Sequence, residues 1–73
     1  MTDTSDAIRR ALLEALLHRV EQDRYPSYTM LDTIESLIES PQEFRRYARV
    51  LLRDIERSPH PSSTMIGRLQ ALI

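Results

Sequence analysis

The stretch Pro26-Ser-Tyr-Thr-Met-Leu-Asp-Thr-Ile-Glu-Ser-Leu-Ile38 decides the fold, because it returns 35 residues later as Pro61-Ser-Ser-Thr-Met-Ile-Gly-Arg-Leu-Gln-Ala-Leu-Ile73. Six aligned pairs are identical: Pro26/Pro61, Ser27/Ser62, Thr29/Thr64, Met30/Met65, Leu37/Leu72 and Ile38/Ile73. About one identity is expected between unrelated stretches of ordinary composition. Two amphipathic helices share their apolar spacing in any case, but that spacing does not explain a shared Pro-Ser-x-Thr-Met string. We therefore expect two copies of one unit, in residues 5–38 and 40–73.

The apolar spacing predicts four helices, near residues 5–23, 28–39, 41–57 and 63–73. Ser40-Pro41-Gln42-Glu43 matches a capping box with proline at the first helical position. No alternation of period two competes with this pattern. The expected fold class is all-α: a small four-helix arrangement made of two tandem helix–loop–helix repeats with an offset of 35. Because one helical hairpin cannot bury its own apolar stripe, we expect the hairpins to pack face to face with a pseudo-two-fold relation.

The apolar positions of the first and third helices are expected to face the core. They are Ile8, Leu12, Leu13, Leu16, Leu17 and Val20, and then Phe44, Tyr47, Ala48, Leu51, Leu52 and Ile55. The arc of the first helix is the wider one, spanning about 180° at about 100° per residue. Leu13 and Leu17 are therefore expected to be surplus to the core and to join two copies into a homodimer. The alternative is that the segment 59–61 folds over them.

A chain of 73 residues makes at most one domain, 1–73. Such a small domain buries a limited share of its surface, and the absence of cysteine excludes disulfides, so self-association would supply useful burial. No apolar run reaches the ~20 residues of a membrane span, and the first ten residues do not resemble a secretory signal. We expect a cytoplasmic protein that does not enter a membrane.

The sequence offers no constellation that carries catalysis or holds a ligand. His18 and His60 lack the spacing of metal ligands and are expected at the surface, as is Gly67, the single glycine. Tyr25 and Tyr28 are expected to cover the end of the first hairpin. We therefore predict no catalytic, cofactor-binding or metal-binding residue and no enzymatic activity. An enzyme that depends on a metal or cofactor is the third and weakest hypothesis.

Two charged stripes remain at helical spacing. Arg46, Arg49, Arg53 and Arg57 line the third helix, and Asp32, Glu35 and Glu39 line the second. Such stripes are typical of solvated helix faces, but they can also recognise a partner. The favoured function is a non-enzymatic helical protein–protein interaction module: a small adaptor, assembly factor or inhibitor that self-associates. The alternative is a small nucleic-acid-binding regulator whose arginine stripe contacts phosphates, although the net charge of −1 gives no general basic footprint.

Overall fold

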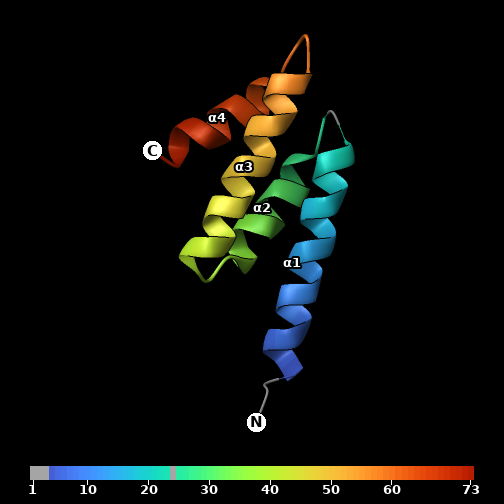
Figure 1. Cartoon of the computed structure of the whole chain (residues 1–73), viewed down its shortest axis with the longest axis vertical. Coiled ribbons are helices and arrows are strands. Elements are labelled where there is room, and N and C mark those ends of the chain that lie inside the picture. The colour runs from blue at the N-terminus through green and yellow to red at the C-terminus, as the bar shows by residue number, and fades with distance from the viewer. Residues whose placement is uncertain (1–3, 24) are drawn as a thin grey trace.

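The computed structural model describes residues 4–23 and 25–73, which form four α-helices and no strand (Figure 1). These helices are α1 (Thr4–Gln22), α2 (Tyr28–Leu37), α3 (Pro41–Arg57) and α4 (Ser63–Ala71). The all-α, four-helix prediction is confirmed, and the observed bounds lie close to the expected ones. Within the described residues, no helix has the length and apolar character that crossing a membrane requires.

Serine caps explain where three of the helices begin. The Ser27 hydroxyl accepts a hydrogen bond from the Met30 N–H at 3.1 Å, and the Ser40 hydroxyl accepts one from the Glu43 N–H at 3.1 Å. Ser62 caps α4 in the same way. Each cap satisfies a backbone donor that has no partner inside its helix. The Glu43 carboxylate reaches back to the N–H of Glu39 at 3.0 Å, one residue earlier than a strict capping box requires.

The helices are arranged as two antiparallel hairpins placed side by side. α1 and α3 contact each other and run in the same direction, while α2 returns along α1 and α4 returns along α3 (Figure 1). The molecule is elongated, with extents of 46 × 24 × 18 Å. Because α1 and α3 are parallel, their carboxyl ends lie at the same edge of the molecule.

The core contains residues from all four helices: Leu13, Leu17, Val20, Leu31, Ile34, Tyr47, Val50, Leu51 and Met65. The prediction that Leu13 and Leu17 are surplus to the core is wrong, since their side chains are only 3% and 1% exposed. The wide apolar arc of α1 has a simple explanation. α1 contacts two helices, α2 and α3, so it must present apolar residues in two directions.

The buried face of α3 also differs from the expected one. Phe44 and Leu52 are 38% and 49% exposed, whereas Val50 and Asp54 are buried. At about 100° per residue, the buried side is rotated by roughly 80° from the centre of the predicted apolar stripe. α1 causes this rotation, because it packs against the side of α3 that carries Arg46. One edge of the apolar stripe of α3 is thereby left uncovered.

Three smaller expectations concern the surface. His18, His60 and Gly67 are exposed, as predicted. The prediction that Tyr25 and Tyr28 cover the hairpin end is wrong, because both are more than half exposed. The Tyr28 ring instead faces the Arg68 guanidinium of α4, whose Cζ lies 5.8 Å from the ring centroid.

Arg9 fastens α1 to the link between α2 and α3, and no sequence pattern distinguishes it from the other arginines of α1. Its Nη1 donates to the carbonyl oxygen of Leu37 at 2.6 Å and to Glu43 Oε1 at 3.0 Å. Its Nε lies 3.2 Å from a carboxylate oxygen of Glu39. The hydrogen bond from Arg9 lowers the pKa of Glu43 below its ordinary value. This guanidinium therefore fixes the angle at which the second hairpin leaves the first.

Candidate functional site

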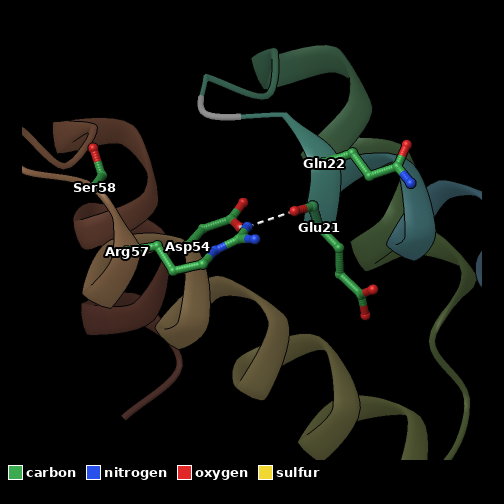
Figure 2. A pocket seen from close by; sticks show the side chains of 5 residues that line it. All are labelled: Glu21, Gln22, Asp54, Arg57 and Ser58. Atoms are coloured by element: carbon green, nitrogen blue, oxygen red, sulfur yellow. Dashed lines mark hydrogen bonds and ion pairs between the residues drawn. The ribbon is translucent and has the colours of Figure 1, made fainter.

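A pocket of about 370 Å³ lies at the edge where α1 and α3 both end (Figure 2). It is lined by Glu21, Gln22, Asp54, Arg57 and Ser58. Two helix carboxyl ends bring two sets of unpaired carbonyl groups and two negative dipole ends to one place. A cation is the chemical species that such an edge favours.

Arg57 supplies that cation from within the chain. Its guanidinium donates to Asp54 Oδ1 and to the carbonyl oxygen of Glu21, as the view in Figure 2 shows. The backbone N–H of Ser58 donates to the carbonyl oxygen of Asp54 at 3.2 Å. Arg57 therefore neutralises a buried carboxylate and caps the end of α1 with the same group. It joins α3 to α1 across the edge.

Asp54 is the one buried acidic side chain of the described residues, with 3% of its surface exposed. Its Oδ2 atom has no hydrogen-bond partner there. Burial raises the pKa of the Asp54 carboxyl above its ordinary value, while Arg57 acts in the opposite direction. The nearby acids Asp23 and Glu21 raise it further. The ionised form of this carboxyl is thus less favourable in the folded chain than in water.

We expect this raised pKa to show as a pH-dependent difference between wild type and Asp54→Asn. As pH rises above about 4, the unfolded chain loses the Asp54 proton before the folded chain does, so the contribution of Asp54 to stability falls. The free energy of unfolding of wild type minus that of the variant should therefore decrease from about pH 4 to about pH 7. Urea denaturation across this range measures it. A difference that grows with pH would mean that the pairing with Arg57 outweighs burial.

The described residues contain no group of three or more histidine, cysteine, aspartate or glutamate side chains placed to hold a metal ion. His18 lies at the surface, where its Nε2 is 3.2 Å from the Gln22 side-chain nitrogen. Asp54 and Arg57 point at each other across the pocket edge. Their ion pair lies within α3, and the hydrogen bond from Arg57 to the Glu21 carbonyl oxygen is the contact that holds α3 to α1.

The predicted arginine stripe of α3 divides into two kinds of residue. Arg46 pairs with Glu14 of α1 at 2.7 Å, and Arg57 is bound as described above. Arg49 and Arg53 are exposed and make no ion pair within the described part of the chain. Arg46 and Arg57 thus already make contacts inside the chain, and the availability of the four arginines to a partner stays a prediction. Arg46 and Arg57 hold α3 against α1.

The acidic stripe of α2 is likewise used inside the molecule. Arg68 of α4 binds Asp32 and, at 3.0 Å, Glu35. The hydroxyl of Tyr47 donates to the other carboxylate oxygen of Glu35 at 2.5 Å. Glu39 lies 3.2 Å from the Arg9 Nε. These acids connect α2 to α4, α3 and α1, and they are the counterparts of arginines in this same chain.

The exposed apolar side chains form the other candidate surface. Ile8 and Leu12 of α1 are 61% and 43% exposed, and Leu52 of α3 and Ile66 of α4 are 49% and 38% exposed. Ile8, Leu12 and Leu52 were expected to face the core. Sequence periodicity places these residues in the apolar stripes of their helices. It does not show which edge of each stripe a neighbouring helix covers. Arg9 and Asp54 were missed because each is one of several charged residues in an amphipathic helix and has no spacing that distinguishes it from the others.

Comparison of the chain with protein-family models, curated proteins and solved structures finds no match.

Proposed function

We propose that this chain is a non-enzymatic helical protein–protein interaction module, a small adaptor, assembly factor or inhibitor, and that it self-associates. The observation that carries the proposal is the uncovered apolar surface on α1, α3 and α4. Exposed apolar patches mark interaction sites on small proteins. Leu13 and Leu17 have no place in it, because they lie in the core. The cytoplasmic location expected from the sequence stays part of this proposal.

The proposal includes the origin of the fold in two tandem copies of one hairpin. α1 and α3 end at Gln22 and Arg57, and α2 and α4 begin at Tyr28 and Ser63, in both cases 35 residues apart. This agreement supports the sequence repeat. A pseudo-two-fold relation would bury equivalent residues of the two hairpins equally. Leu17 is buried and its equivalent Leu52 is exposed, which favours two hairpins stacked in the same orientation instead. Superposing residues 5–38 on 40–73 tests the repeat, since unrelated interhelical geometry would refute it.

A capture experiment tests the interaction function. Wild type and Leu52→Asp serve as baits in a lysate of the source cell, after nuclease treatment, with quantitative mass spectrometry as the readout. We expect a protein that wild type enriches and the variant does not, because a charge at Leu52 disrupts the apolar surface. Equal recovery by both baits, or recovery that nuclease abolishes, would contradict the proposal.

The second candidate, a small nucleic-acid-binding regulator, rests on Arg49 and Arg53, the two exposed arginines of the stripe that form no ion pair with residues 4–23 or 25–73. Changing both to glutamine is expected to alter the free energy of unfolding by no more than about 0.5 kcal/mol, because both side chains are exposed and neither is paired within the described part of the chain. Denaturant titration measures this. If the chain binds nucleic acid, the same change should lower both the affinity and its salt dependence. Absence of binding to mixed DNA and RNA at low salt would exclude this candidate.

A further inference from the structure

The second hairpin displays the apolar positions that the first hairpin buries. Leu17 and Leu31 are 1% and 0% exposed, whereas the residues 35 positions later, Leu52 and Ile66, are 49% and 38% exposed. Leu17 and Leu31 belong to one core cluster, so these positions share one side of a hairpin. In the first hairpin that side is covered by the second. We call Phe44, Leu52 and Ile66 the tail face.

The first hairpin displays the converse surface. Ile8 and Leu12 are exposed on α1, and we call them the head face. The residues 35 positions later are Glu43, which binds Arg9, and Tyr47, which is fully buried. The head face is therefore the counterpart of the α3 surface that docks on the first hairpin.

The two faces lie on opposite sides of the α1–α3 pair. At about 100° per residue, Leu12 and Ile8 average about 140° around α1 from Glu14, which contacts α3. By the same measure, Leu52 lies about 120° around α3 from Arg46, which contacts α1. One copy can therefore offer both faces at once.

We propose that the tail face of one copy binds the head face of a second copy, in the way that the second hairpin of each chain stacks on the first. The inference deepens the proposed function, on which it rests, by naming the partner as another copy of this chain. The contact joins two different surfaces, so it is heterologous. Each added copy leaves one head and one tail free, and assembly therefore continues beyond a dimer.

The charges across the joint support this pairing. Inside the chain, the joint carries the ion pair between Arg9 and Glu43. Between two copies, the equivalent residues are Phe44 of one and Ile8 of the next, both exposed and both apolar. The contact between copies thus has an apolar pair where the contact inside the chain has an ion pair, and it places no like charges together at these two positions. Association through such a joint should depend only weakly on salt.

Sedimentation velocity on two variants separates this contact from every symmetric dimer. Leu12→Asp destroys the head and keeps the tail, while Leu52→Asp destroys the tail and keeps the head. Each variant alone should be monomeric, with association weakened by at least about 100-fold, because a carboxylate would be buried without a partner. An equimolar mixture of the two should form a heterodimer and nothing larger. Wild type should form species larger than a dimer as its concentration rises.

Ile8→Asp and Ile66→Asp provide a second head and tail pair, and circular dichroism checks that each variant keeps its helices. Tyr25→Gln is the control, since it removes an exposed apolar ring outside both faces and should leave association unchanged. A wild type that stays monomeric at high micromolar concentration refutes the inference, as does a folded single variant that still dimerises alone. If wild type is monomeric but still captures another protein through Leu52, the inference and the proposed self-association fail, and the protein–protein interaction function stands.

Discussion

Leu17→Ala is expected to lower the free energy of unfolding by about 2–5 kcal/mol, the cost of removing a fully buried leucine side chain. Leu17 is 1% exposed and belongs to the core cluster that joins all four helices. A domain of 73 residues has a total stability of roughly 4–11 kcal/mol. The variant should therefore lose a large share of its total stability. Urea denaturation followed by circular dichroism measures the change.

Leu52→Ala is the matched control, because it makes the same substitution 35 residues later in a side chain that is 49% exposed. It should cost less than about 1 kcal/mol when the protein is dilute enough to be monomeric. Equal losses of stability at the two positions would contradict the observed packing. They would favour the pseudo-two-fold arrangement instead, in which equivalent residues of the two hairpins are equally buried.

Tyr47→Phe is expected to lower the free energy of unfolding by about 1–2 kcal/mol, because it removes a hydrogen bond to a charged group and keeps the ring. Tyr47 is fully buried, and its hydroxyl donates to the Glu35 carboxylate at 2.5 Å. The cost stays below that of a fully buried bond because Glu35 is partly exposed and keeps its contact with Arg68. Tyr25→Phe, at an exposed ring, should change stability by no more than about 0.5 kcal/mol.

The same tyrosine gives a second readout in alkali. Burial and the neighbouring Glu35 raise the pKa of Tyr47 above its ordinary value. The folded chain therefore holds the phenol proton more tightly than the unfolded chain does, and stability is lost as pH rises above about 10. Tyr47→Phe should weaken this alkaline loss. An unchanged alkaline profile in the variant would show that other groups cause it.

Local signals were sufficient to predict the helices. Ser27, Ser40 and Ser62 supply caps, and Pro26 and Pro61 restrict the residues before them, so the helix bounds follow from neighbours in the sequence. These effects act within one turn of helix and need no knowledge of the rest of the fold.

The side of each helix that is covered was harder to predict. Periodicity gives the width of an apolar stripe, but the position of a neighbouring helix decides which edge is buried. On α3, α1 packs against the side that carries Val50 and Arg46, so Val50 is buried and Leu52 is not. The same contact made Arg46 a structural residue although its spacing placed it in a solvated stripe.

Asp54 shows a further reason why the candidate site could not be predicted in full. A single acid in an amphipathic helix is ordinarily solvated. Its burial follows from the carboxyl ends of α1 and α3 meeting at one edge, where Arg57 binds both Asp54 and the end of α1. That meeting depends on α1 and α3 being parallel, which no local signal specifies.

The elongation of the molecule has a hydrodynamic consequence. A compact chain of this length has a radius of gyration of about 11 Å, whereas this one has 12.6 Å, and its longest dimension of 46 Å is about twice the next. A single copy experiences more friction than a sphere of equal mass, so it should diffuse slowly and leave a gel-filtration column ahead of a round protein of 8.5 kDa. If copies stack through head and tail, α1 of each lies beside α3 of the last. The assembly would then grow perpendicular to the long helices, so it would form a ribbon whose width is set by the length of one copy.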